Sequence, residues 1–322
     1  MEYNERLESL SMSNGHAKKI LVPLYNTSRG LQQRLPIRIP PYAFVENVQG
    51  LLKLDQFELW KDYVAKRDLD VFGSMRIALV RKYEGTNLST DEEDKAAQDH
   101  LYKLFMCLRL VKPTRTRFAA VHVRVSAEKD IEVFSFTHPS SQPVNVPNSE
   151  RLNLLTEQDL NHTANLSERF LDFVDHGPAN LRRAVRFYEE AYSNVWDPVL
   201  QLVTWVIGIE AACLNEERVA PPADLLEKIS RLISPDQDIY GNSPMKQEPL
   251  GYSTVPVFRV GDAIRDLFEL RNRFIHGLWI PPDWAERMMY QSVGAPPVFY
   301  ADALRDAAAY ILRQLILRQV ER

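Results

Sequence analysis

The sequence predicts an α+β protein in which an N-terminal mixed α/β domain precedes an all-α helical bundle. Short runs rich in β-branched and aromatic residues recur before residue 137, whereas every strong periodic signal after residue 156 is helical. A proline-rich segment separates the two regions. The chain of 322 residues is therefore expected to contain a flexible leader (1–17), a sensing or regulatory domain (18–137), a linker (138–155) and the bundle (156–322).

The composition is that of an ordinary globular protein, with 45% hydrophobic and 25% charged residues. It excludes a disordered chain, a collagen and a coiled-coil rod. Lys and Arg total 39 against 43 Asp and Glu, which gives a net charge of −4. This balance argues against a strongly basic nucleic-acid binder as a description of the whole chain, although local basic patches remain compatible with it.

The only two cysteines, Cys107 and Cys213, cannot by themselves build a zinc site or a disulfide scaffold, which favours a reducing compartment. No apolar run approaches the ~18 residues needed to span a membrane. The polar N-terminus lacks the apolar core of a signal peptide, so a cytoplasmic location is expected. With no histidine spacing typical of zinc and no P-loop, neither a metal nor another cofactor is expected.

The N-terminal domain is expected to combine strands with two helices. The helices are predicted over about Leu54–Arg67 and Thr90–Leu110, the second opening with acidic residues suited to a helix N-terminus. The predicted strands are KKILVPL from Lys18, MRIALVRK from Met75, RFAAVHVRV from Arg117 and IEVFSF from Ile131. The following segment, Thr137–Glu150, holds three prolines and almost nothing that can pack, which is typical of a linker.

Capping signals delimit the helices of the bundle. Thr156 and Asp159 resemble a capping pair, Asp197-Pro198 combines an N-cap with proline at the first helical position, and Gly277 is suited to a C-cap. The predicted helices run over about 156–176, 179–193, 198–215, 223–233, 257–276 and 302–320. Their short and medium connections favour an antiparallel bundle.

One face of the helix predicted over 257–276 is apolar. At 100° per residue, Arg271 falls in the middle of this stripe. A buried arginine is costly unless it is paired, so an acidic partner on another helix is expected. The stripe consists of Val260, Ile264, Leu267, Phe274, Ile275 and Leu278.

The helix that starts at Pro198 carries the matching charge. Glu210 lies within its predicted apolar stripe, so the two most apolar helices each place one charge of opposite sign on a packed face. We therefore expect Glu210 and Arg271 to pair, because a carboxylate facing a guanidinium satisfies two parallel hydrogen bonds. The stripe consists of Val199, Val203, Val206, Ile207, Cys213 and Leu214.

Polar residues are dense near the end of the helix predicted over 257–276, where Arg271, Asn272, Arg273 and His276 fall within two turns. The negative end of the helix favours a protonated imidazole at His276. Histidine can transfer a proton near neutral pH and arginine can stabilise phosphate oxygens, a combination suited to phosphodiester chemistry. The alternative interpretation is a structural ion pair that fixes helix register, with His276 as a surface residue.

These residues resemble a known signature. Arg271–His276, followed by Gly277, resembles the R-x4-H motif of the HEPN superfamily, in which a polar residue typically follows the arginine. Trp205–Leu214 is similar to the hydrophobic–Glu–Ala helix of the Apea-like HEPN group, and the Arg- and Tyr-rich Leu181–Tyr192 fits the same layout. The resemblance covers about 156–320 and does not reach the N-terminal domain.

The resemblance implies a helical bundle that forms a homodimer and brings two R-x4-H motifs into one cleft. Many relatives are metal-independent ribonucleases of toxin or antiviral (phage-defence) systems. In that class a ribose 2′-hydroxyl attacks the adjacent phosphate and leaves a cyclic phosphate and a 5′-hydroxyl.

Carried over to this chain, the resemblance makes His276 the general acid/base and Arg271 the stabiliser of the phosphorane. Asn272 would orient the phosphate or His276, while Glu210 holds Arg271 and Arg273 supports the site. Arg271 and His276 lie about 140° apart around the helix, so a two-fold axis is needed to bring them to one point.

A basic face on the helix over 179–193, formed by Arg182, Arg183 and Arg186, is a candidate RNA-binding strip, although a solvated face is the simpler interpretation. Arg259, Arg265 and Arg273 would extend this strip if the two helices lay side by side. Tyr188, Tyr192 and Trp196 could stack on bases, but their helical spacing favours the core.

The sequence thus favours a ribonuclease effector that acts on RNA. The alternative from a different class is a non-catalytic dimerisation module that binds RNA or a protein partner. A third interpretation is a toxin partnered by a nucleotidyltransferase-like antitoxin or another regulatory protein.

Overall fold

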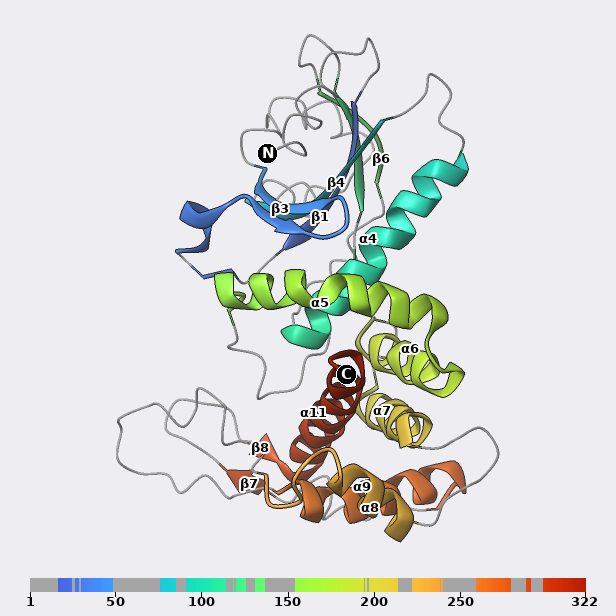
Figure 1. Cartoon of the computed structure of the whole chain (residues 1–322). Coiled ribbons are helices and arrows are strands. Elements are labelled where there is room, and N and C mark those ends of the chain that lie inside the picture. The colour runs from blue at the N-terminus through green and yellow to red at the C-terminus, as the bar shows by residue number, and fades with distance from the viewer. Residues whose placement is uncertain are drawn as a thin grey trace. The chain divides into compact units, whose positions relative to one another are not determined.

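The computed structural model confirms an α+β protein and divides it into two compact units (Figure 1). The first comprises 1–109, 116–143 and 154–168, and the second comprises 110–115, 144–153 and 169–322. The residues that the structure describes are 17–24, 27–28, 30–48, 76–84, 91–113, 118, 120–125, 131–136, 154–193, 195, 197–213, 222–237, 239, 259–278, 288–290 and 298–322.

The first unit is built on an antiparallel sheet with the strand order β2-β3-β4-β1-β5-β6. Central strands β1 and β4 are paired in register from Ala17–Glu84 to Leu24–Ile77. The strands are β1 (Ala17–Leu24), β2 (Ile37–Ile39), β3 (Ala43–Asn47), β4 (Ile77–Glu84), β5 (Val121–Val125) and β6 (Ile131–Phe136).

Four of these strands occur where the sequence predicts them, and β2 and β3 were not predicted. In β4 the consecutive residues Ile77, Ala78, Leu79 and Val80 are all buried, so both faces of this central strand are covered. A strand that is buried on both faces has apolar residues at successive positions, so its sequence shows only partial alternation of apolar and polar residues.

Helix α4 (Asp91–Val111) matches the prediction over 90–110 and is joined to the sheet by side-chain hydrogen bonds. His122 of β5 contacts Gln98 Oε1 through Nε2 at 3.1 Å, and Arg81 of β4 contacts His100. His122 is buried, so this hydrogen bond gives a polar atom of the interior a partner. The helix predicted over 54–67 lies outside the described residues, as do the leader apart from residue 17 and the predicted linker apart from 154–155.

Helix α5 (Glu157–His176) begins in the first unit, ends in the second, and starts with the expected capping pair. Thr156 Oγ1 donates to Asp159 Oδ2 at 2.7 Å, and the Asp159 backbone N–H donates back to Thr156 Oγ1 at 3.3 Å. This reciprocal pair satisfies backbone donors that the first helical turn leaves open.

The second unit is a helical bundle arranged around α11 (Tyr300–Val320), which packs against α6, α7 and α9 (Figure 1). Helix α6 begins and ends where the sequence predicts, and α7 opens with Asp197 Oδ1 accepting from the Leu200 N–H at 2.8 Å. The remaining elements of the unit are α6 (Ala179–Ser193), α7 (Pro198–Cys213), α8 (Pro222–Ser230), α9 (Val260–Ile275), β7 (Met288–Tyr290) and β8 (Val298–Phe299).

Helices α6, α7 and α11 approach closely at Gly208. A Cβ at this position would lie 2.5 Å from Leu312 Cδ2 and 3.1 Å from Phe187 Cβ. The short β7–β8 pair lies between the helices predicted over 257–276 and 302–320 and was not predicted, because strands of two or three residues leave too little periodicity to detect.

Candidate functional site

The site begins with α9, whose apolar side chains are buried in the first three turns and exposed in the last turn. Val260, Ile264 and Leu267 are core residues, as predicted. Phe274, Ile275 and Leu278 are 39%, 49% and 56% exposed, so the predicted apolar stripe is wrong at its C-terminal end. Periodicity indicates which side of a helix is apolar, but it does not indicate how far along the helix its partners extend.

Glu210 and Arg271 form the predicted ion pair between α7 and α9. Arg271 Nη2 donates to Glu210 Oε2 at 2.8 Å, which confirms the pairing inferred from the two helices. Their side chains remain 23% and 16% exposed, so the pair lies at the border of the helix contact rather than in its sealed interior. The sequence placed both charges on a packed face, and the structure shows that each is only partly buried there.

The packed face of α7 also differs from the predicted stripe. Leu202, Trp205 and Ile209 are buried, whereas Val199, Ile207 and Cys213 are only half-buried. A helix this apolar is buried around most of its circumference, so its hydrophobic pattern marks no single face. Glu210 lies on the same half-buried side of α7 as Ile207 and Cys213.

Asn272 extends the ion pair into a three-residue contact. Its Oδ1 accepts a hydrogen bond from Arg271 Nη1 at 2.7 Å, so the two terminal nitrogens of the guanidinium are held by different residues. Arg271 Nε is buried and has no hydrogen-bond partner within the described part of the chain. The guanidinium is therefore fixed in orientation by Glu210 and Asn272.

His276 terminates α9 on the exposed surface. It is the C-cap residue, and Gly277 follows it with φ 62°, the left-handed conformation that glycine adopts at low cost. The N–H groups of Gly277 and Leu278 donate to the carbonyls of Phe274 and Arg273 at 3.1 and 2.8 Å, which forms a Schellman motif. The backbone thus holds His276 at the negative end of the helix, in contact with solvent.

Electrostatics at the pair are set by two opposing effects. Partial burial raises the pKa of Glu210 above its usual value of 4.5, because water stabilises the carboxylate better than the helix interface does. The charge of Arg271 and its hydrogen bond lower this pKa and offset part of the effect. Loss of Arg271 would therefore leave a carboxylate that is easier to protonate.

Arg273 lies one residue beyond Asn272 but faces another partner. Its Nε donates to Glu269 Oε1 at 3.0 Å, an i,i+4 pair along α9. Arg259 pairs with Asp236 at 3.3 Å and Arg265 with Asp266 at 3.7 Å. Because carboxylates accompany all three, they add less positive charge to an extended RNA-binding strip than the sequence suggested.

The candidate RNA-binding strip lies on α6, away from that helix's buried face of Leu181, Ala184 and Val185. Arg183 and Arg186 are exposed, and Arg182 is half-buried with Nη1 donating to the Asp175 carbonyl at 3.4 Å.

Tyr188 and Tyr192 are core residues, as their spacing favoured, and are only 1% exposed. Tyr192 makes an edge contact with Trp205, with ring centroids 5.0 Å apart. Neither tyrosine is available to stack on bases, and Trp196 lies outside the described residues.

No group of three His, Cys, Asp or Glu residues suited to a metal ion occurs in the part of the chain that the structure describes. Over the same residues, no helix combines the length and apolar character needed to cross a bilayer.

Comparison with protein-family models, with curated protein sequences and with solved structures found no match to this chain.

One group of basic residues was not predicted from the sequence. Lys228 and Arg231, at and just after the end of α8, line a cavity in the second unit together with Arg322, which lies far along the chain from them. Their positions near helix ends were the only signal in the sequence, and a basic residue in a last helical turn usually serves the helix itself.

Proposed function

We propose that this protein is a metal-independent endoribonuclease of the HEPN type. The observation that supports the proposal is the inter-helix contact of Glu210 with Arg271 at 2.8 Å, beside an exposed histidine at the end of the same helix. Held in this way, the guanidinium presents a fixed positive charge, and fixed charges stabilise a transition state without reorganising.

In the proposed reaction a ribose 2′-hydroxyl attacks the neighbouring phosphorus and the bond to the 5′-oxygen breaks. His276 transfers the protons, one taken from the 2′-hydroxyl and one delivered to the leaving 5′-oxygen. Arg271 stabilises the charge on the phosphorane oxygens. Glu210 is a positioning residue, because it acts only through Arg271.

We further propose that a homodimer completes the site. The separation of about 140° between Arg271 and His276 around one helix disfavours a site formed by a single protomer. A two-fold axis would place His276 of one chain near Arg271 of the other. A protein that remained monomeric at working concentration and still cut RNA at full rate would contradict this shared site.

The test uses labelled single-stranded RNA in the presence of a chelator. We expect the wild type to leave cyclic phosphate ends, and both His276→Ala and Arg271→Ala to lose cleavage by at least about a hundredfold. His162→Ala and Arg318→Ala are matched controls, since both side chains are exposed and lie outside the site. Substrates with 2′-deoxyribose at the cut position should resist cleavage.

One observation favours the alternative, a non-catalytic module that binds RNA or a protein partner. Glu210 and Asn272 already occupy the two terminal nitrogens of Arg271, as in an ion pair that only fixes the register of α7 and α9. RNA binding without cleavage by the wild type, unchanged in His276→Ala, would support the module and reject the nuclease.

We also propose that the enzyme acts as an effector of a toxin or antiviral system, with an antitoxin or regulatory protein as a further partner. This proposal rests on the HEPN resemblance alone. Growth arrest on expression of the wild type, relieved by His276→Ala, would support it.

A further inference from the structure

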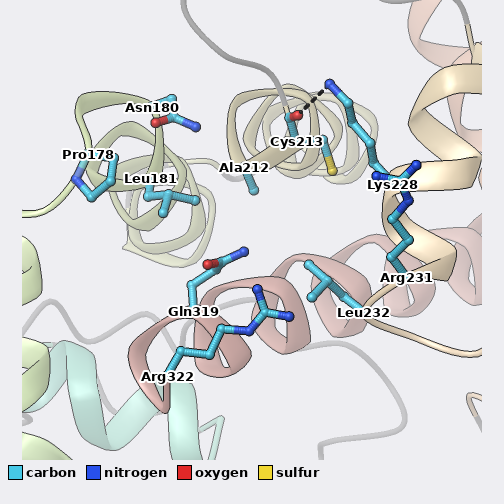
Figure 2. A pocket seen from close by; sticks show the side chains of 10 residues that line it. All are labelled: Pro178, Asn180, Leu181, Ala212, Cys213, Lys228, Arg231, Leu232, Gln319 and Arg322. Carbon is cyan, nitrogen blue, oxygen red and sulfur yellow. Dashed lines mark hydrogen bonds between the residues drawn. The ribbon is translucent and has the colours of Figure 1, made fainter.

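A cavity of about 370 Å³ lies among the ends of four helices in the second unit (Figure 2). Its walls come from the start of α6, the end of α7, the residues at and after the end of α8, and the end of α11. The volume lies at the lower end of the range typical of small-molecule sites, about 300–1,000 Å³. Neither Glu210 nor Arg271 lines this cavity, so it is separate from the site proposed above.

Positive charge dominates the lining. Lys228, Arg231 and Arg322 contribute three cations, and none of the lining residues that the structure describes is acidic. Glu227, which accepts from Arg231 at 2.6 Å, neutralises one of these charges from outside the lining. Among the side chains that the structure describes here, three cations and one paired carboxylate leave an excess of two positive charges.

Hydrogen bonds to the ends of the helices use only some of the N–H donors of these cations. Lys228 Nζ donates to the Cys213 carbonyl at the end of α7, at 3.1 Å, which uses one of its three N–H groups (Figure 2). The Arg322 guanidinium has no hydrogen-bond acceptor or acid partner within the described residues. Two ammonium protons and a complete guanidinium fork therefore remain for a ligand.

The rest of the lining is suited to an organic body rather than to a bare ion. Leu181 and Leu232 provide apolar walls on opposite sides of the space, and Gln319 extends its amide between them (Figure 2). Asn180 also lines the cavity, with its Nδ2 held by the Ala211 carbonyl at 3.2 Å. Apolar walls with a few polar groups are typical of small-molecule sites.

We propose that this cavity binds a phosphate monoester with an organic body the size of a nucleoside. A phosphate monoester carries a charge of about −1.5 to −2 at pH 7, which matches the excess positive charge of the lining. The planar fork of Arg322 fits two phosphate oxygens, and Lys228 adds a point charge. The inference does not depend on ribonuclease activity.

The test is calorimetric titration of the full chain with adenosine 5′-monophosphate in a buffer free of phosphate. We expect saturable binding that weakens as salt is raised, and no saturable binding of adenosine. Ribose 5-phosphate and inorganic phosphate are the further probes. Binding of ribose 5-phosphate as tight as that of the nucleotide would support the oxyanion site and show that the base is not recognised.

Two variants and one control locate the binding. Arg322→Gln should weaken binding of adenosine 5′-monophosphate about tenfold, and Lys228→Gln combined with Arg322→Gln should weaken it further. Arg318→Gln is the matched control, because Arg318 is an exposed arginine of α11 that lies shortly before Arg322 in the chain and outside the lining. Arg322 is exposed, so its variant is expected to fold normally and to melt like the wild type.

Three results would overturn the proposal. They are the absence of saturable binding to every phosphate probe at millimolar concentration, equal affinity in the wild type and in Arg322→Gln, and an equal loss in Arg318→Gln. Inorganic phosphate that binds as tightly as the nucleotide would show a simple anion site and would also reject the organic body.

Discussion

Glu210 and Arg271 join α7 to α9 through a hydrogen-bonded ion pair of 2.8 Å in which neither side chain is fully buried. Both the guanidinium and the carboxylate keep some contact with water, so the pair avoids much of the desolvation cost of a sealed salt bridge. The same partial exposure leaves the guanidinium accessible to solvent. Variants of the pair can therefore separate its structural role from the catalytic role proposed for Arg271.

The first prediction concerns Arg271→Ala and pH. At neutral pH this change leaves Glu210 charged, half-buried and unpaired, and should lower the free energy of unfolding by about 1–3 kcal/mol. Without Arg271 the pKa of Glu210 rises further above 4.5, because both influences that lower it are lost. The folded variant then holds the proton more tightly than the unfolded chain, so its stability falls as pH rises through that window.

The measurement is urea denaturation near pH 4 and near pH 7, where we expect Arg271→Ala to be less damaging at the lower pH. Adding Glu210→Gln to Arg271→Ala removes the titrating group and should abolish this difference. A pH dependence that survives in the double variant would show that another group is responsible.

The second prediction compares the two motif residues in stability. His276→Ala should change the free energy of unfolding by less than about 0.5 kcal/mol, because the side chain is exposed at the end of α9. Arg271→Ala should therefore melt at a clearly lower temperature than His276→Ala. Equal melting temperatures would contradict a supporting role for the ion pair.

The third prediction concerns the close approach of three helices at Gly208. Gly208→Ala should destabilise the protein by about 1–3 kcal/mol, since the new methyl group would overlap Leu312 and Phe187. This loss outweighs the gain of roughly 1 kcal/mol in helix propensity. Gly30→Ala is the matched control, with open space around its Cβ position, and should be nearly neutral. An increase in stability for Gly208→Ala would refute this close packing.

The fourth prediction concerns the two thiols. Burial raises the pKa of Cys213 to about 12, with the charge of Lys228 opposing the rise, and burial also raises the pKa of Cys107 well above its usual range. Near pH 7.5 both should react with a disulfide reagent roughly a hundredfold more slowly than a free thiol. Lys228→Met should slow Cys213 further and leave Cys107 unchanged. Complete modification of the native protein within seconds would contradict the burial of both residues.

The secondary structure of the second unit was largely predictable because its signals are local. Thr156 with Asp159, Asp197 before Pro198, and Gly277 after His276 each satisfy or terminate backbone groups within a few residues. The pairing of Glu210 with Arg271 was predictable for a different reason. Glu210 is the one charged residue of α7, Arg271 interrupts the apolar stripe of α9, and burial requires a partner of opposite sign.

Strands β2 and β3 and the β7–β8 pair were not predictable to the same degree. They are short, and their stability depends on the neighbouring strand rather than on their own sequence. The last turn of α9 was assigned to the core because Phe274, Ile275 and Leu278 continue the apolar period, although no helix partner buries them in the described structure.

By itself the sequence determined the α+β class, the Glu210–Arg271 pair and the helices of the second unit to within a few residues, because capping, periodicity and charge compensation act over short distances or admit few partners. Only the tertiary structure decided how deeply that pair is buried and that Lys228, Arg231 and Arg322 meet at one cavity. Burial depth and the convergence of distant side chains depend on how the helices pack against one another, and hydrophobic periodicity does not predict that arrangement.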